Sequence, residues 1–261
     1  MNTGNLTAEL VALRRRLPLA ISLAVSETKA RYRRSVLGPW WLTLGAGIGV
    51  LGLGIVWSAL LNQAPSELMP RLAIGLVLWQ FISGSLVEAS SVFIRQAQII
   101  RNYNLPLIMH PLQLVMRQLI TLAHNIAIVL LMIVCFPHAF SFYGLVGILG
   151  LIIVTANLLF IVIIIGVAGT RFRDLDPLVQ SLMPLLFFVT PVIYEPKNLG
   201  ISQFVIWLNP FTYFMEIVRA PFFGKIPCLW VYGVSFVSMV VCGIVAISLL
   251  SGRGRRLAFW L

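Results

Sequence analysis

The stretch between Gln118 and Thr170 contains no Lys, Arg, Asp or Glu. It is too long for one helix, and a Pro-His pair at Pro137 marks a turn inside it. A helix needs roughly 20 mostly apolar residues to cross the hydrocarbon core of a membrane. The pattern therefore predicts two membrane-spanning helices joined by a short turn, over 111–136 and 143–170.

The composition of the whole chain excludes an ordinary soluble domain. Hydrophobic residues make up 59% of the 261 residues, charged residues make up only 10%, and the mean hydropathy is +0.96. Average soluble domains carry about 25% charged residues. With so few charges, a soluble fold of this size could not cover its own apolar surface. We therefore predict an all-α membrane protein.

Four further apolar segments complete a six-helix pattern. The first is free of charge, the second is interrupted by Glu88, and the fifth is short and contains Pro184 and Pro191. The predicted transmembrane domain, 38–251, thus has spans over 38–61, 72–94, 111–136, 143–170, 177–194 and 228–251. A segment over 1–37 precedes this domain, and a tail over 252–261 follows it.

The basic residues indicate the orientation of the spans. The chain has 19 Lys and Arg against 8 Asp and Glu, a formal net charge of +11. Fifteen of the 19 lie in the two terminal segments, in the fourth-to-fifth connection, and in or just beyond the second-to-third connection, and all of these regions face one side. Because basic loops stay in the cytoplasm, we expect both termini there. Topology also explains the net charge better than nucleic-acid binding does. The other side has only four basic residues: Arg71, Lys197, Arg219 and Lys225.

The N-terminal segment is basic and amphipathic. Its leucines fall on one helical face: Leu6, Leu10, Leu13 and Leu17. Three arginines at 14–16 crowd the other side, and we expect Pro18 to end this helix, with a second one continuing to Arg34. Two interpretations stay open. The segment lies in the cytoplasmic membrane interface, or it is a solvated helix that contacts a cytoplasmic partner.

Two connections differ from ordinary loops. The connection over 96–105 is polar and basic, and prolines end the helices around it. It is either a plain loop or a short cytoplasmic helix that docks a soluble subunit. The stretch over 202–222 is largely apolar, but prolines cut it into pieces too short to cross a membrane. We predict two short re-entrant helices there, with a surface loop as the alternative.

The sequence lacks the motifs of an enzyme. It has no GxxxxGK[ST] loop, no HExxH, no GxSxG and no CxxC pair. Asp174 and Asp176 resemble the acidic metal–nucleotide pair of sugar transferases. However, they lie beside Arg171 and Arg173, just before a proline, where charge pairing and helix capping suffice. We expect a protein that is not an enzyme and holds no metal or cofactor.

Three features of the spans have two interpretations each. Glu88 is the one carboxylate well inside a span, so it is either functional or hydrogen-bonded between helices. The glycines of the first span, from Gly45 to Gly54, either permit close helix packing or form a smooth wall for a polymer. The tryptophans lie mostly near span ends, which is typical of an aromatic belt, and stacking on sugar rings is the alternative.

The residues that enter the first span resemble the signature of ABC-2 type polysaccharide export permeases, in particular the O-antigen and teichoic-acid exporters. They read Arg31-Tyr-Arg-Arg-Ser-Val-Leu-Gly-Pro-Trp-Trp-Leu42. Three further pieces fit in the same order, and the last is followed by Glu216 and Arg219: Arg173–Leu175, Thr190–Tyr194 and Leu208–Tyr213. The first motif is fairly specific, whereas the others recur across ABC-2 permeases. The resemblance covers essentially the whole chain.

This resemblance implies a homodimer in the bacterial inner membrane that works with two separate ATPase subunits, which bind ATP and Mg. It implies as cargo an undecaprenyl-pyrophosphate-linked polysaccharide, and a channel lined by the first and fifth spans. The implied cytoplasmic gate for the lipid-linked glycan consists of Arg31, Tyr32, Arg33, Arg34, Trp40 and Trp41. The implied coupling helix carries Gln96, Gln98, Arg101, Asn102, Tyr103 and Asn104. The channel and its exit would use Glu88, Tyr194, Trp207, Tyr213, Glu216 and Arg219.

Other functions remain open at this level. Arginine forks suit the oxygens of a diphosphate, but topology alone also explains the cluster Arg31–Arg34. An ABC-2 permease could instead export teichoic acid, capsule, a drug or a simple lipid. A membrane-embedded glycosyltransferase that uses Asp174 and Asp176 is the alternative from another class of protein.

Overall fold

The protein is described by a computed structural model that covers residues 6–38, 40–103, 105–194 and 203–261. Side chains are described there except at 6–17, 203, 252–256 and 258–259. Every regular element within these ranges is a helix, so the prediction of an all-α membrane protein is confirmed. The helices are α1 (Leu6–Arg31), α2 (Trp40–Leu61), α3 (Pro65–Ala89), α4 (Ala97–Asn102), α5 (Met109–Cys135), η1 (Pro137–Ala139), α6 (Gly144–Arg171), α7 (Leu175–Val189), α8 (Gln203–Leu208), α9 (Pro210–Phe222) and α10 (Leu229–Trp260).

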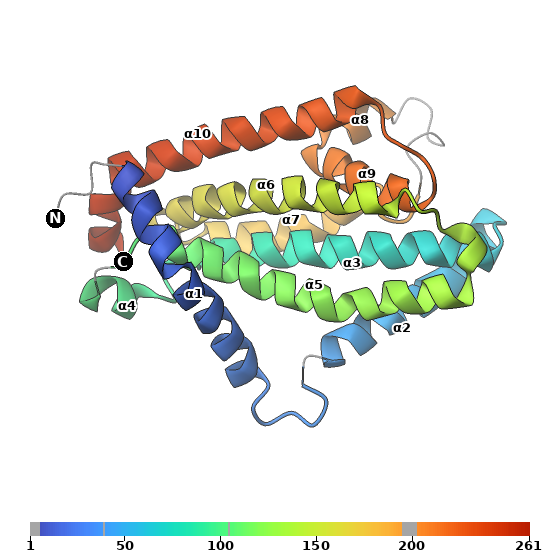
Figure 1. Cartoon of the computed structure of the whole chain (residues 1–261), viewed down its shortest axis with the longest axis horizontal. Helices are drawn as coiled ribbons and strands as arrows, with labels where there is room; N and C mark the ends of the chain where they lie inside the picture. The colour runs from blue at the N-terminus through green and yellow to red at the C-terminus, as the bar shows by residue number, and fades with distance from the viewer. Residues whose placement is uncertain (1–5, 39, 104, 195–202) are drawn as a thin grey trace.

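The long helices run along the longest axis of the molecule (Figure 1). Helix α4 and the end of α10 lie at one end of this bundle, and α8 and α9 lie toward the other. Helix α1 crosses the bundle obliquely near the α4 end and packs on α5. The two ends therefore carry different groups of predicted functional residues.

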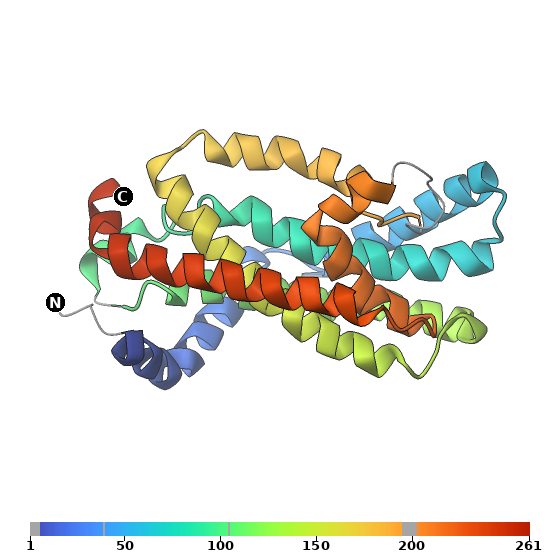
Figure 2. The same ribbon diagram turned by 90° about the horizontal axis from the view of Figure 1, so that it is seen from above.

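Five helices among the described residues are long and apolar enough to cross a membrane: α2, α3, α5, α6 and the Leu229–Ser251 part of α10. The predicted fifth span, 177–194, contains α7, which is apolar but has only 15 residues. Helix α7 runs beside α3, from the side of α4 toward α8 (Figure 2). The count of six spans thus depends on α7 together with the bend over 190–194, and it stays a prediction, as do the re-entrant helices.

Helix α3 is the centre of the bundle. In its most apolar window 72% of the residues are buried, against 22% in α2 and α10. It packs on α2, α5, α6, α7 and α9, and its fully buried side chains include Leu72 and Ile82. The less buried helices leave wide apolar faces uncovered, as expected of helices that face lipid.

Glycines bring α6 into direct backbone contact with its neighbours. A Cβ on Gly150 would lie 2.4 Å from the carbonyl oxygen of Ile217 in α9. A Cβ on Gly169 would lie 2.0 Å from that of Ser90, just after α3. Small residues allow such close approach between membrane helices. These positions therefore fix α9 and the end of α3 rigidly against α6.

The glycines of α2 behave differently. A Cβ on Gly45, Gly47, Gly49 or Gly52 would meet nothing within 4 Å. Helix α2 is instead connected to α5 and α3 by polar contacts. Thr43 donates a hydrogen bond to Asn125 at 3.0 Å, and Asn125 donates one to Gln80 at 2.8 Å. Close packing within this chain is therefore not the role of these four glycines.

Two helices continue beyond their expected ends. The expectation that Pro18 ends the first helix is wrong, since α1 continues to Arg31. Its next turns bury Ala20 and Ala24 completely in the contact with α5, and this burial compensates for the backbone hydrogen bond that a proline cannot make. The predicted tail, 252–261, continues α10 as a helix, with Leu257 fully buried.

Candidate functional site

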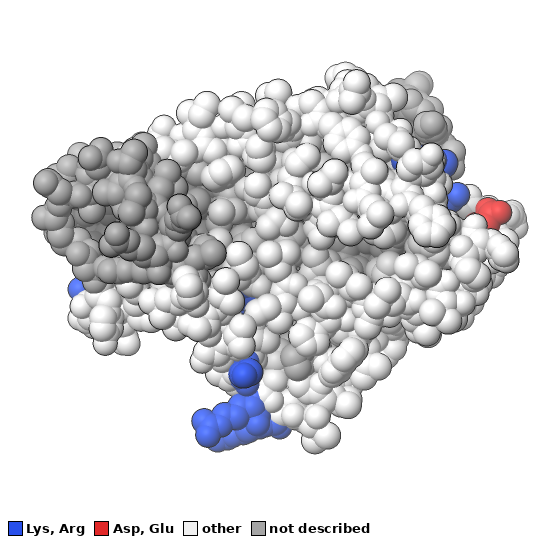
Figure 3. All heavy atoms as spheres, in the orientation of Figure 1, with Lys and Arg blue, Asp and Glu red and all other residues white. Residues whose placement is uncertain are grey.

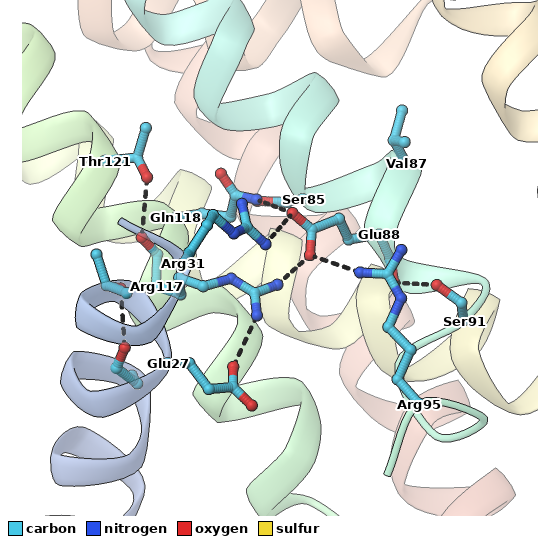
Figure 4. Close-up of polar contacts among 12 residues, drawn as sticks. Glu27, Arg31, Ser85, Val87, Glu88, Ser91, Arg95, Arg117, Gln118 and Thr121 are labelled. Carbon is cyan, nitrogen blue, oxygen red and sulfur yellow. Dashed lines mark hydrogen bonds and ion pairs between the residues drawn. The ribbon is translucent and has the colours of Figure 1, made fainter. Parts of the chain in front are cut away.

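A cluster of ion pairs joins α1, α3 and α5 next to α4 (Figure 4). Its centre is Glu88, in the last turn of α3. Arg117 of α5 donates a short hydrogen bond to Glu88 Oε2, and Arg95 donates one to the same oxygen at 3.2 Å. On Oε1, Gln118 donates at 3.2 Å and Arg31 Nη2 lies 3.6 Å away. Four side chains from three parts of the chain thus converge on one carboxylate.

Glu27 of α1 completes this inner cluster, a name that we use for Glu27, Arg31, Glu88, Arg95, Gln96, Arg117 and Gln118. Its carboxylate accepts hydrogen bonds from Arg117 Nη1 at 2.7 Å and from Gln96 Nε2 at 2.9 Å. Arg117 therefore bridges two carboxylates on two other helices. The side chain of Arg117 is only 13% exposed, and a cation so shielded from water needs a carboxylate partner.

The inner cluster also holds the segment that enters α4. Arg95 and Gln96 directly precede α4, and they bind carboxylates on α3 and α1 respectively. Helix α4 itself has no buried residue. Displacement of α4 would therefore pull first on Glu88 and Glu27.

The predicted coupling residues lie on and around α4. Gln98, Arg101, Asn102 and Tyr103 are exposed, whereas Gln96 is half-buried and bound to the inner cluster. Asn104 lies outside the described residues. An exposed short helix at the end of the bundle offers a surface that a partner protein could hold.

The predicted gate residues follow the inner cluster along the chain. Arg31 ends α1, and Tyr32, Arg33 and Arg34 form the turn after it. The side chains of both arginines in this turn are exposed, as are Trp40 and Trp41 at the start of α2. On the face of the molecule seen in Figure 3, Lys and Arg gather at the connection from α1 to α2, and the described surface along the bundle shows almost no charge.

The two aspartates around the start of α7 have a structural environment. Asp176 accepts a short hydrogen bond from Ser90 and another from Gln180 Nε2 at 2.8 Å. Asp174 is the residue before α7, and its side chain makes no capping hydrogen bond. Among the described residues, no group of three or more His, Cys, Asp or Glu could hold a metal. Asp176 therefore ties α7 to the end of α3.

A groove of about 490 Å³ runs between α3 and α7. Aromatic side chains line it together with a few polar ones, among them Glu88 at the inner cluster: Trp79, Phe187, Phe188, Ser83, Gln180 and Glu88. Glu88 thus connects the inner cluster to a groove between two predicted spans.

At the end opposite α4, Arg219 of α9 is buried and holds the bend after α7. Its Nη1 donates hydrogen bonds to the carbonyl oxygens of Pro191 at 2.6 Å and Val192 at 3.2 Å. Its Nη2 donates to the carbonyl of Tyr194 at 3.4 Å and lies 3.7 Å from Glu216. This arginine thus replaces the helical partners that the carbonyls of the bend lack.

Beside Arg219 lies a cavity of about 270 Å³, which we call the aromatic pocket. Its lining combines aromatic and charged side chains from α3, α8, α9 and α10: Arg71, Trp207, Glu216, Arg219, Phe223, Lys225 and Trp230. The rings of Trp207 and Trp230 are 5.0 Å apart, and Tyr213 packs against both. Four predicted exit residues, Trp207, Tyr213, Glu216 and Arg219, therefore lie together, with Tyr194 bound to Arg219, whereas Glu88 belongs to the inner cluster.

Sequence reasoning missed Glu27, Arg95, Arg117 and Gln118. Arg117 lies six residues into the predicted span 111–136, and a cation at that depth requires a carboxylate from a neighbouring helix. The position of Arg117 inside a span could therefore have indicated an ion pair with another helix. The identity of the partners could not be deduced, because it depends on which helices cross at this depth.

The comparisons with known proteins agree with this architecture. The ABC-2 type transporter family matches the chain over residues 19–223. A Myxococcus xanthus relative named "O-antigen export system permease protein RfbA" is 24% identical over 208 residues, which cover 78% of this chain and 80% of the relative. Two Klebsiella pneumoniae relatives of the same name are 24% and 25% identical over 197 residues, 74% of this chain and 75% of each relative. The chain therefore belongs to the ABC-2 type transporter family.

Proposed function

We propose that the chain is the membrane-spanning subunit of an ABC exporter that moves undecaprenyl-pyrophosphate-linked polysaccharide of the O-antigen type across the bacterial inner membrane. The similarity to permeases named for O-antigen export, over about three quarters of this chain and of those relatives, carries the proposal. The chain is a conduit that makes and breaks no covalent bond of its cargo.

Energy comes from two separate ATPase subunits that bind ATP and Mg. They dock on α4, in the cytoplasm together with both termini. The exposure of α4 and the excess of basic residues on its side of the membrane support this orientation. ATP binding closes the ATPase pair, displaces α4 and shifts the equilibrium between a closed and an open channel.

The cargo enters at the gate residues Arg31–Trp41. Its diphosphate carries negative charge, and the guanidinium groups of Arg33 and Arg34 are exposed where α1 meets α2. Arginine forks bind phosphate oxygens through charge-assisted hydrogen bonds. Trp40 and Trp41 stand at the start of the span that follows, where the glycan would begin its passage.

Two copies of the chain form the channel. Four glycines of helix α2, at 45, 47, 49 and 52, have open space beside them, and α7 exposes Leu178, Leu182, Leu185 and Phe188. A second copy would cover part of these faces and enclose a path beside the groove between α3 and α7. The polymer then slides along small and aromatic side chains.

The test is reconstitution with a candidate ATPase followed by substitution of α4. Arg101→Glu and Tyr103→Ala should leave the membrane complex intact but uncouple ATP hydrolysis from export of the lipid-linked polysaccharide. Arg173→Gln, at an exposed arginine before α7, is the matched control. Turnover of a labelled sugar donor by the purified chain alone, lost in Asp174→Asn with Asp176→Asn, would instead establish a glycosyltransferase.

A further inference from the structure

His110, in the first turn of α5, is buried without a hydrogen-bond partner. It is 4% exposed, and neither of its ring nitrogens is hydrogen-bonded to any of the described residues. Phe93, which is fully buried, packs edge to face against the imidazole, with 6.4 Å between the ring centres. Buried polar atoms are nearly always hydrogen-bonded, because an unpaired one has lost its contacts with water. We therefore expect a partner for this imidazole.

A small cavity, which we call the His110 cavity, lies beside this side chain. One wall is a single face of α5, because its four lining residues are spaced as neighbours on a helix: His110, Gln113, Leu114 and Arg117. The other walls come from α1, from the end of α3 and from the segment before α4: Glu27, Glu88, Val92, Arg95 and Gln96. The His110 cavity thus adjoins the inner cluster.

Arg117 brings a second unpaired group to the His110 cavity. Its two terminal nitrogens bind Glu27 and Glu88, but its Nε is buried and has no hydrogen-bond partner within the described ranges. Long side chains of a helix lean toward its N-terminal end, which for Arg117 is the direction of His110. Two unpaired groups from one helix face therefore line one cavity.

The His110 cavity has the size and the chemistry of a water site. About 20 Å³ is open to the centre of a water molecule, and roughly 10–15 Å³ is enough to hold one. A sugar needs far more space, since typical ligand sites measure roughly 300 Å³ or more. The carboxylates in the walls accept hydrogen bonds, the guanidinium groups donate them, and a neutral imidazole does both. Water, which also does both, can satisfy several of these groups at once.

We propose that the His110 cavity holds ordered water that joins His110 to the inner cluster. The water accepts a hydrogen bond from Arg117 Nε and, directly or through a second water, donates one to the unprotonated nitrogen of His110. Water can enter from the α4 end, because Arg95, which lines the cavity, has a side chain that is 55% exposed. This water site does not depend on the cargo or on the ATPase.

A hydrated inner cluster can exchange its partners more easily than a dry one. When an ion pair opens in a dry interior, both charges lose their partner, whereas water in the His110 cavity can bind either of them. His110 then acts as a positioning residue, which keeps the water beside Arg117 and touches no cargo.

NMR of the full-length protein in nanodiscs, with isotope-labelled histidines, tests for this water directly. The chain has three histidines, and the signals of His110 are those that disappear in His110→Gln. The carbon-bound ring protons of His110 should show cross-relaxation with long-lived water although the residue is buried. His124, whose Nδ1 lies 2.7 Å from the carbonyl oxygen of Ile120, is the internal reference for a ring bonded to protein. A His110 ring that contacts no water, or that is bonded to the amide of Gln113 instead, overturns the proposal.

Thermal unfolding of His110 variants tests whether the water stabilises the protein. His110→Phe keeps an aromatic ring beside Phe93 but removes both nitrogens. With water in the cavity, this variant should unfold on the order of 3 °C lower, because the water loses a partner. In a dry cavity the same change removes two unpaired polar atoms, so an equal or higher unfolding temperature overturns the proposal.

Two further variants separate hydrogen bonding from packing. His110→Gln, whose amide donates and accepts, should unfold close to the unchanged protein, and a loss as large as that of His110→Phe would contradict the water link. His124→Phe, at a half-buried histidine outside the His110 cavity, is the matched control and should lose less than His110→Phe. If His110→Phe does not fold, the NMR measurement on the unchanged protein decides.

Discussion

Each end of the bundle holds an arginine, half-buried Arg117 at one end and buried Arg219 at the other, but the two arginines have different partners. Arg117, near α4, is bound by carboxylates from α1 and α3. Arg219, at the other end, donates hydrogen bonds to backbone carbonyls of the bend over 190–194 and also lies 3.7 Å from Glu216. A carboxylate can be neutralised or repelled by a neighbouring charge, whereas a carbonyl cannot. We therefore expect the α4 end to rearrange more easily than the opposite end.

This difference matches the surroundings of the two arginines. The inner cluster joins the segment before α4 to α1 and α3, which under the proposed function are the parts that a docked ATPase would move. Arg219 lies on α9, whose backbone touches α6 directly at Gly150. Four predictions test this contrast, ordered from the largest expected effect to the smallest.

Gly150→Val tests the rigidity of the fixed end. The new side chain would collide with the backbone of α9, which cannot yield as a flexible side chain can. We expect a loss of about 3 kcal/mol in the free energy of unfolding, measured by thermal unfolding in detergent. Gly47→Val in α2, where a Cβ meets nothing within 4 Å, is the control and should change stability little. Equal losses of stability in the two variants would mean that the close contact of Gly150 with the backbone of α9 does not stabilise this end of the bundle.

Arg117→Leu tests the inner cluster. It leaves Glu27 and Glu88 without their common partner, which should destabilise the protein by about 2–3 kcal/mol, since both carboxylates are partly exposed. Adding Glu88→Leu should recover part of the loss, because the unpaired carboxylate is removed. If the double variant is no more stable than the single one in denaturant titration, the pairing has no energetic role.

The lysine variants of both arginines compare the two ends directly. Arg219→Lys should cost about 2 kcal/mol, because one ammonium group cannot reach the carbonyls of both Pro191 and Tyr194. Arg117→Lys should cost about 1 kcal/mol, because a single charge still lies between two carboxylates. Chemical unfolding of the two variants side by side checks the order, and a reversed order would mean that the α4 end is the more rigid one.

Glu27→Gln should have the smallest effect on stability, about 1 kcal/mol or less, because Glu27 is one-third exposed. Its effect should instead be local. Hydrogen–deuterium exchange should rise over 95–103, because Arg117 loses an ion pair and Gln96 now faces a neutral amide. Glu67→Gln, at an exposed carboxylate in the first turn of α3, serves as the control. If exchange over 95–103 is unchanged in the Glu27 variant, the contact of Glu27 with Gln96 does not stabilise the segment that enters α4.

The uncharged runs of the sequence predict the long helices well, because a helix in lipid must be apolar along its whole length. They do not predict which face of each helix contacts a neighbouring helix. The glycines of α2 and α6 look alike in sequence, yet only those of α6 touch a neighbouring backbone. Likewise, Glu88 is a conspicuous residue, but its partners Arg31 and Arg117 become neighbours only through the crossing of α1, α3 and α5. Such pairings depend on long-range geometry that no local pattern encodes.

The sparse attachment of α2 has a mechanical consequence. Its buried residues form one narrow stripe, made of Thr43, Ala46, Val50, Gly54 and Ser58, and Leu53 and Trp57 also pack against the core. The buried side chains of the stripe are small, so Leu53 and Trp57 would lose the largest contacts if the helix slid sideways. The hydrogen bonds from Thr43 to Asn125 and from Asn125 to Gln80 would hold the start of α2 in place while the rest of the helix tilts away from α3. In the proposed homodimer, tilting of both α2 helices would widen the channel for a bulky sugar while the remaining helices stay packed.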